Sequence, residues 1–187
     1  MIVASDRTQL SPHRLLRLKQ YANEVAHLEG DVAEVGVWKG GSAKWLCHLF
    51  PERTVYLFDT FKGMPTPDPK LDGHREGDFG DTSLESVRSY LHGFPNALFC
   101  AGMFPKTAEG LAGPFVLVHV DCDLHTSTRD AIEFFWPRLA SGGIMVFDDY
   151  KSGQCAGATK AIDEFARSVG VELEGNAPHE AAIARKA

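Results

Sequence analysis

The sequence predicts a single domain, residues 1–187, of the α/β class, with helices on both faces of a mostly parallel, doubly wound sheet. Short apolar runs without alternation, which are typical of strands buried on both faces, alternate along the chain with segments of helical period. Two of these runs, Phe115–Val120 and Ile144–Phe147, are separated by roughly twenty residues of helical period. That is the length of a crossover between two parallel strands.

The composition is that of an ordinary globular domain, with 44% hydrophobic and 24% charged residues. A net charge of −6 disfavours a nucleic-acid groove, which needs a basic face. No apolar run approaches the roughly 20 residues of a membrane helix, and the N-terminus has no secretory apolar region. We therefore expect a cytoplasmic protein that binds neither nucleic acid nor a membrane.

The four cysteines, Cys47, Cys100, Cys122 and Cys155, are widely spaced and form no C-x-x-C pair. This pattern favours reduced thiols that are buried or incidental over a zinc site or a disulfide framework.

Residues 1–30 are expected to form a loose arm followed by a helix. Ser11 and Pro12 are a helix N-cap and a proline at the first helical position. Apolar residues then recur at helical spacing as far as Leu28, and Gly30 is placed to end the helix. The apolar stripe of this helix covers either the sheet or a partner subunit, and the sequence leaves both open.

A glycine-rich turn, GVWKGGS at residues 36–42, links a predicted first strand, Val32–Val37, to a helix that ends near Phe50. This architecture brings backbone N–H groups close to a ligand. The turn lacks the lysine of a phosphate-binding P-loop and is not a GxGxxG motif, so a plain tight turn is the alternative. A second strand, Thr54–Phe58, ends at Asp59, where nucleoside-binding folds hold ribose hydroxyls. A solvated aspartate at a strand end is the alternative there.

Residues 60–81 are rich in glycine and proline, and a loop of this length in a compact domain is expected to be a flap over an active site. Residues 82–85, TSLE, read as a capping box that opens a helix to about His92. The remaining expected elements are a strand at Ala97–Cys100, a short helix at Lys106–Leu111, a helix at Gly157–Val169, and two final strands at Val171–Leu173 and Ala181–Ala184.

Three aspartates follow the two central strands, Asp121 after the first and Asp148 and Asp149 after the second. If the strands are adjacent, their ends lie about 5 Å apart, at the sheet edge where open α/β folds bind ligands. Like charges this close repel one another unless a cation lies between them. The sequence therefore predicts a divalent metal site with oxygen ligands.

Four blocks of sequence resemble the macrocin-type O-methyltransferases: EVGVWKGGS at 34–42, FDTFKGMP at 58–65, DCDLHTST at 121–128 and DDY at 148–150. The similarity extends from about Gly30 to Phe165. The resemblance implies a Rossmann-like class I methyltransferase fold, usually with a seven-stranded sheet whose last strand is antiparallel. It also implies an S-adenosylmethionine-dependent enzyme that methylates a hydroxyl of a sugar or another small, diol-bearing natural product.

In this resemblance, Asp121, Asp148 and Asp149 bind Mg²⁺, the glycine turn with Glu34 holds the methionine end of S-adenosylmethionine, and Asp59 binds its ribose. Trp38 and Phe104 are expected to stack near the adenine or the sulfonium, with core packing as the alternative. The full expected cofactor-binding set is Glu34, Gly36, Trp38, Gly40, Gly41, Ser42, Asp59, Gly102, Phe104 and Asp121. Members of the family are usually homodimers, so the resemblance also implies a homodimer.

A sugar hydroxyl is a poor nucleophile, and a hard cation lowers its pKa and fixes its position. Asp121 is the leading candidate for the base that takes the proton, followed by Asp123 and His125. Asp123 is alternatively a cap at a helix start, and His125 is alternatively a hydrogen-bonding residue there. His125 also stands where the family usually has tyrosine.

Two other functions remain open at this stage. Asp121-Cys122-Asp123 has the DxD form with which nucleotide-sugar glycosyltransferases bind a metal-diphosphate. A non-catalytic S-adenosylmethionine-binding module is the other alternative, although it has no need of three metal-binding aspartates.

Overall fold

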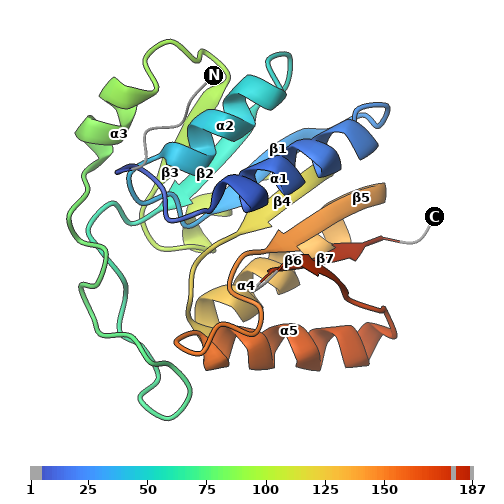
Figure 1. The fold of residues 1–187 in the computed structure, drawn as a ribbon. Helices are drawn as coiled ribbons and strands as arrows, with labels where there is room; N and C mark the ends of the chain where they lie inside the picture. Colours follow the sequence, from blue (N-terminus) through green and yellow to red (C-terminus); the bar gives the residue numbers. More distant parts are fainter. Residues whose placement is uncertain (1–5, 178–179, 186–187) are drawn as a thin grey trace.

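The computed structural model describes residues 6–177 and 180–185, and in it a seven-stranded sheet lies between two layers of helices (Figure 1). The strands are β1 (Asp31–Val35), β2 (Val55–Asp59), β3 (Ala97–Ala101), β4 (Phe115–Val120), β5 (Leu139–Phe147), β6 (Glu174–Ala177) and β7 (Glu180–Ala184). The helices are α1 (Pro12–Glu24), α2 (Gly41–Leu49), α3 (Leu84–Tyr90), α4 (His125–Phe135) and α5 (Ala156–Val169), with 3₁₀ turns at Lys106–Ala108 and Trp136–Arg138.

The order of strands across the sheet is β3-β2-β1-β4-β5-β7-β6. Strands β1 to β5 pair in parallel, and β7 runs antiparallel to both β5 and β6. All six residues of β4 are buried, because β4 lies at the centre of the sheet with helices on both faces. The expected α/β fold, including the adjacent parallel pair β4 and β5, is confirmed.

Two apolar cores flank the sheet. Leu18 of α1, Leu46 of α2 and Val87 of α3 pack on one face, and Phe135 of α4 and Ile162 of α5 pack on the other. The buried stripe of α1 therefore covers the sheet, which settles the alternative that the sequence left open. In the described residues, no helix is long and apolar enough to cross a membrane.

Several predicted boundaries are wrong, each for a local reason. The first strand ends at Val35, because Gly36 turns the chain with φ of 90°. Helix α1 ends at Glu24, before Leu28. The strand expected at Val171–Leu173 begins at Glu174, because Val171 N–H still donates to Ala166 O at the end of α5.

The capping box at the start of α3 is also a wrong prediction. Ser83, not Thr82, is the N-cap, and its side chain accepts from Ser86 N–H. The hydroxyl of Thr82 instead donates to Trp38 O at 2.5 Å, which joins α3 to the glycine turn. The helix expected at Lys106–Leu111 shortens to the 3₁₀ turn Lys106–Ala108.

Candidate active site

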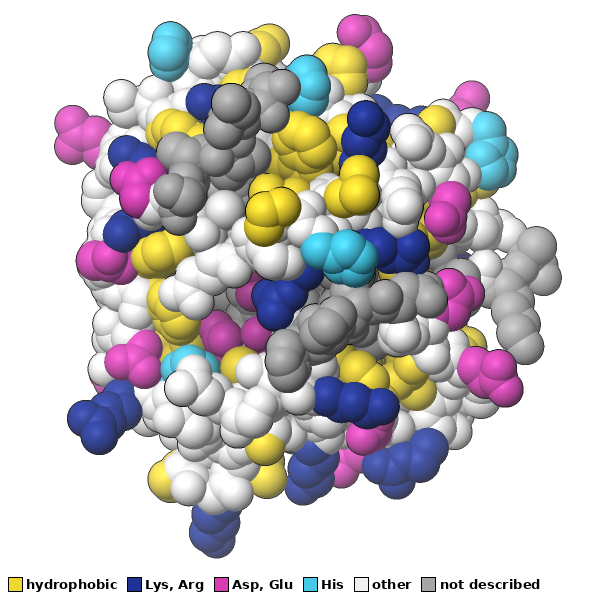
Figure 2. All heavy atoms as spheres, in the orientation of Figure 1, with side chains coloured by type: hydrophobic (Ala, Val, Ile, Leu, Met, Phe, Trp, Pro, Cys, Tyr) yellow, Lys and Arg dark blue, Asp and Glu magenta, His cyan; other side chains and the backbone are white. Residues whose placement is uncertain are grey.

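The carboxyl ends of the parallel strands open into a cavity of about 280 Å³. The long loop between β2 and α3, residues 60–81, lies on the left of Figure 1, along this edge of the sheet. Figure 2 shows acidic side chains inside a hollow of the molecule, beside basic side chains at its rim. The lining residues come from the arm, the glycine turn, the strand ends, the long loop and the loop before α5. Those used below are Arg7, Arg14, Gly36, Trp38, Ser42, Asp59, His74, Phe79, Gly102, Phe104, Asp121, Asp123, Asp148, Asp149 and Cys155.

At two positions the glycine turn packs so closely against neighbouring backbone that there is no room for a side chain. A Cβ on Gly36 would lie 1.7 Å from the carbonyl oxygen of Asp121, so only glycine lets β1 turn beside the end of β4. A Cβ on Gly41 would lie 2.5 Å from Arg7 O, which accepts a hydrogen bond from Gly41 N–H. The predicted loose arm is thus docked on this turn through Arg7, and residues 1–5 lie outside the described residues. Gly40 and Gly41 shape the turn without lining the cavity.

Asp59, at the end of β2, is held rigidly at the cavity wall. Its Oδ2 accepts from the N–H groups of Val37 and Trp38 at 2.7 and 2.9 Å, and its Oδ1 accepts from Phe61 N–H at 2.6 Å. These bonds fix the direction of the carboxylate before any ligand binds. One lone-pair site, on Oδ1, remains to accept from a ribose hydroxyl.

The strand-end aspartates Asp121, Asp148 and Asp149, hereafter the acidic cluster, meet as predicted. Their carboxylate oxygens lie within 4.8 Å of one another. Burial is the main cause that raises the pKa of Asp148 to about 6, that of Asp149 to about 7, and that of Asp121 well above its ordinary value. Repulsion from neighbouring carboxylates adds to it, from Asp149 on Asp148, from Asp123 on Asp149, and from Asp148 and Asp149 on Asp121. Arg14 of α1 donates to Asp148 Oδ2 at 2.5 Å and partly offsets this charge.

The acidic cluster fits a hard divalent cation. It offers only carboxylate oxygens, the ligands that Mg²⁺ prefers, and they lie close enough together to surround one ion. The contact with Arg14 had no signal in the sequence. It arises because the N-terminal helix packs beside the strand ends.

Asp123 lies next to the acidic cluster, but its carboxylate is not one of the three that form the cluster. It adopts a left-handed backbone with φ of 59°, and its N–H donates to Asp149 Oδ2 at 2.9 Å. Its Oδ1 accepts from the Cys155 thiol at 3.2 Å, and its side chain makes no cap at α4, where Leu124 is the N-cap residue. Burial raises the pKa of Asp123. The side chain therefore faces the cavity as a partly desolvated carboxylate.

Two expected site residues point elsewhere. Glu34 is fully buried, and its Oε1 lies 2.9 Å from Nδ1 of the equally buried His119, so the pair belongs to the sheet interior and does not line the cavity. His125 begins α4, and its Nε2 lies 3.6 Å from Glu164 Oε2 on α5, away from the lining. The structure thus places neither Glu34 nor His125 in the cavity lining.

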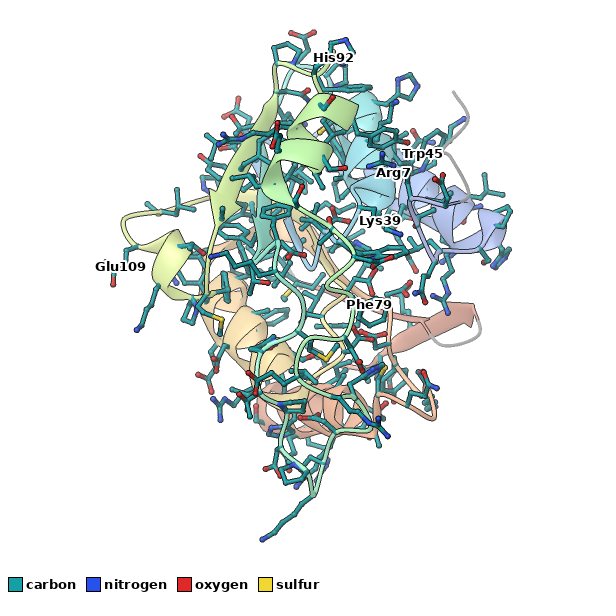
Figure 3. All side chains as sticks on the ribbon, turned by 90° about the vertical axis from the view of Figure 1, so that its left-hand side faces the viewer. Arg7, Lys39, Trp45, Phe79, His92 and Glu109 are labelled. Atoms are coloured by element: carbon teal, nitrogen blue, oxygen red, sulfur yellow. The ribbon has the colours of Figure 1, made fainter. Side chains whose placement is uncertain are left out.

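The two aromatic candidates both line the cavity, but differently. The indole N–H of Trp38 donates to Asp81 Oδ1 at 2.7 Å, and its ring meets the edge of Phe79 from the long loop. Phe104 packs against Phe58 and Phe135 in the core and presents its remaining surface to the cavity. In Figure 3, which views this edge directly, Phe79 lies near the middle and Lys39 and Arg7 lie above it.

Comparison with known proteins agrees with this geometry. A family model described as macrocin-O-methyltransferase (TylF) matches residues 5–175. A curated relative from Streptomyces olivaceus, 8-demethyl-8-(2,3-dimethoxy-alpha-L-rhamnosyl)-tetracenomycin-C 4'-O-methyltransferase, is 32% identical over 146 residues, covering 69% of this chain and 56% of the relative. Demethyldecarbamoylnovobiocin O-methyltransferase from Streptomyces niveus is 28% identical, covering 87% of this chain and 68% of the relative. The chain thus spans little more than half of the first of these relatives.

Solved structures show the same fold. The O-methyltransferase NovP superposes with a TM-score of 0.86 at 24% identity, covering 97% of this chain and 83% of that chain. The calicheamicin methyltransferase CalS11 superposes with a TM-score of 0.79 at 21% identity, covering 94% of this chain and 80% of that chain. At these identities the likeness establishes the architecture.

Proposed function

Because this chain belongs to the macrocin-O-methyltransferase family of class I methyltransferases, we propose that it transfers the methyl group of S-adenosylmethionine to a hydroxyl of a sugar or of another small, diol-bearing natural product. The observation that carries the proposal is one cavity lined by both the glycine turn with Asp59 and the acidic cluster. This arrangement offers a nucleoside site and a hard-cation site within reach of each other.

The choice of acceptor follows the relatives. The Streptomyces olivaceus relative is named for a 4' position of a rhamnosyl-bearing compound, and a Micromonospora griseorubida relative, 28% identical, is named mycinamicin III 3''-O-methyltransferase. We extend the class of acceptor from these names, a hydroxyl on a glycosylated natural product, to this chain.

On the cofactor side, Asp59 would hold the ribose, and Gly36, Trp38, Ser42, Gly102 and Phe104 would surround the remainder of S-adenosylmethionine, all of them lining the cavity. Because Asp59 is fixed by three backbone N–H groups, it would not have to be ordered when the cofactor binds. Pre-organisation of this kind lowers the entropic cost of binding.

On the acceptor side, Asp121, Asp148 and Asp149 would hold Mg²⁺. When bound, this ion would lower the pKa of the acceptor hydroxyl and fix its oxygen. The cavity residues would orient the acceptor so that its oxygen lies in line with the methyl group, a positioning effect that can contribute about 7–11 kcal/mol to the barrier reduction.

Asp123 is the base that the geometry favours. The oxygens of Asp121 belong to the acidic cluster, and His125 lies outside the lining, whereas Asp123 faces the cavity beside that cluster. Its raised pKa moves it towards the operating pH, where a general base is most effective. Asp123 would accept the proton of the hydroxyl as the oxygen attacks.

The DxD alternative is weakened by the same geometry. The ligand atoms of Asp121 group with Asp148 and Asp149, whereas those of Asp123 group with His74 and Cys155, so the two aspartates do not form one metal pair. A non-catalytic module would leave the acidic cluster without a purpose.

The first test is isothermal titration with S-adenosylhomocysteine, the product of the cofactor, in Mg²⁺ and again in excess EDTA. We expect binding under both conditions, because the nucleoside and cation sites use different residues. Stabilisation by a sugar nucleotide without binding of S-adenosylhomocysteine would reject the proposal in favour of a glycosyltransferase.

Asp59→Ala should weaken S-adenosylhomocysteine about 10- to 100-fold, since a hydrogen bond to a charged group contributes about 1.5–3 kcal/mol. Asp59→Asn is the matched control, because the side-chain oxygen of the asparagine can still accept from the N–H groups of Val37 and Trp38. A melting temperature measured for both variants separates loss of the ribose contact from loss of the turn.

A further inference from the structure

A second group of metal-ligating atoms lies beside the acidic cluster. Nε2 of His74, Oδ1 of Asp123 and Sγ of Cys155, hereafter the mixed cluster, lie within 4.8 Å of one another. The separations are 3.6 Å from His74 to Asp123, 3.2 Å from Asp123 to Cys155 and 3.7 Å from Cys155 to His74. These residues come from three separate loops.

The spacing suits a tetrahedral ion. Zinc bonds of about 2.0 Å to oxygen, 2.0–2.1 Å to nitrogen and 2.3 Å to sulfur imply ligand–ligand separations of about 3.3–3.6 Å. The three observed separations fall within a few tenths of an ångström of that range. The atoms therefore need only small side-chain adjustments to surround one ion.

The loops that carry the cluster are tied together independently of it. Gly73 N–H donates to Gln154 O at 3.3 Å, and a Cβ on Gly73 would lie 2.8 Å from the same oxygen. Asp72 Oδ1 accepts from His125 N–H at 2.8 Å, at the start of α4. The long loop that Figure 3 shows across this edge is thus anchored beside both partners of His74.

The outer contacts also resemble those of a metal site. Nδ1 of His74 lies 3.4 Å from Asp78 Oδ2, which is itself fixed by the N–H of Arg75 at 2.9 Å. In zinc sites, the nitrogen of a ligating histidine that does not bind the metal commonly donates to a carboxylate. Asp149 Oδ1, 3.5 Å from Cys155 Sγ, places a fourth oxygen nearby.

We propose that His74, Asp123 and Cys155 bind Zn²⁺ at a second metal site, distinct in chemistry from the acidic cluster. A thiol, an imidazole and one carboxylate favour a borderline-soft ion, whereas three carboxylates favour a hard one. In the ion-free protein the thiol donates to Asp123. On binding, that proton is released to solvent and the thiolate becomes the ligand.

Binding has two consequences. The ion joins the long loop to the loops after β4 and before α5, and it occupies the carboxylate of Asp123. If Asp123 is the base, which rests on the proposed function, Zn²⁺ inhibits methyl transfer. The site itself rests on geometry alone, so it is tested without any measurement of activity.

The test uses the full chain, stripped of metal and titrated with Co²⁺ as a spectroscopic substitute for Zn²⁺. We expect a thiolate-to-cobalt charge-transfer band in the near ultraviolet that one equivalent of Zn²⁺ abolishes. Cys155→Ser should lose the band, whereas Cys100→Ser, which removes a half-buried thiol on β3, should keep it. Absence of the band in the unaltered protein, or its persistence in Cys155→Ser, would overturn the proposal.

Two further variants locate the ion and control for misfolding. Asp148→Asn should keep the band, because Asp148 belongs to the acidic cluster and not to the mixed cluster. Loss of the band in Asp148→Asn would show that the ion binds at the acidic cluster and would reject the proposal. Asp78→Asn, on the exposed side of the long loop, should weaken Zn²⁺ about 10- to 100-fold, the usual effect of losing an outer contact. Unchanged affinity in Asp78→Asn and in His74→Gln would likewise reject it.

Discussion

The acidic cluster and the mixed cluster lie side by side, with Cys155 Sγ 3.5 Å from Asp149 Oδ1, yet they are built in different ways. The three aspartates of the acidic cluster directly follow two adjacent parallel strands, so the sheet alone brings them together. The mixed cluster takes His74 from the long loop, Asp123 from the turn after β4 and Cys155 from the N-cap of α5. Its assembly depends on how three loops pack.

The two clusters also differ in charge. Burial, with repulsion between carboxylates, raises the pKa of Asp148 to about 6 and that of Asp149 to about 7, so the acidic cluster is stabilised by protonation or by a cation. The mixed cluster can satisfy itself without one, because its thiol donates to its carboxylate. We therefore expect the stability of the folded protein at neutral pH to depend on an ion in the acidic cluster. We expect no such dependence for the mixed cluster, whose side chains hydrogen-bond to one another without an ion.

The largest expected effect separates the clusters by function. Asp148→Asn removes one ligand of the hard ion and should lower kcat about 10³-fold, since such an ion stabilises the reaction by several kcal/mol. S-adenosylhomocysteine affinity should stay within about twofold, because Asp59 and the glycine turn are untouched. Full activity of Asp148→Asn in the presence of a chelator would show that the metal mechanism is wrong.

Asp123→Asn should affect both regions at once. Loss of a general base typically lowers the rate about 10²- to 10⁴-fold, and we expect kcat to fall at least about 10²-fold with little change in cofactor affinity. The same variant should weaken Zn²⁺ binding. Unchanged kcat would return the role of base to Asp121, the leading candidate from the sequence.

A change of pH should act chiefly on the acidic cluster. In the metal-free protein the folded pKa values of Asp148 and Asp149 lie above the unfolded value of about 3.9, so the folded state binds more protons and its stability falls as pH rises from about 4 through 7. Mg²⁺ should therefore stabilise the protein more at pH 8 than at pH 6, by about 1–2 kcal/mol.

Thermal melts in Mg²⁺ and in EDTA at the two pH values measure this difference. Asp149→Asn is the matched control, because it removes one titrating carboxyl and can still accept from Asp123 N–H. An identical dependence on pH in the parent and in Asp149→Asn, both in EDTA, would contradict the electrostatic account of the acidic cluster.

The smallest effect is expected at His125. Its ring lies outside the cavity lining, with Nε2 3.6 Å from Oε2 of Glu164 on α5, so His125→Gln should change kcat less than about twofold. Steady-state kinetics over a range of pH are sufficient to check this. A fall of tenfold or more would restore His125 to the catalytic group.

Three side chains make contacts that the sequence did not predict. Glu34 lies two residues before the glycine turn, but its side chain is buried on a covered face of the sheet, where its register partner His119 of β4 contacts it from 85 positions away in the chain. His125 follows the DxD pair closely, yet the start of α4 rotates it towards α5. Thr82 does not cap α3, and its hydroxyl donates to the carbonyl oxygen of Trp38 instead.

From the sequence alone, the apolar runs predicted a mostly parallel α/β sheet, and Asp121, Asp148 and Asp149 were expected to meet if their two strands are adjacent, because the carboxyl ends of parallel strands share an edge. The tertiary structure decided that β4 and β5 are adjacent and fixed the order of the strands. The sequence also favoured reduced cysteines that are buried or incidental, since no local spacing links Cys155 to His74. Tertiary structure alone decided that these two meet beside Asp123, and that Arg14 reaches Asp148. The physical reason is that loop packing depends on contacts between residues far apart in the chain, such as the hydrogen bond from Gly73 N–H to Gln154 O. Such contacts leave no periodic pattern in the sequence.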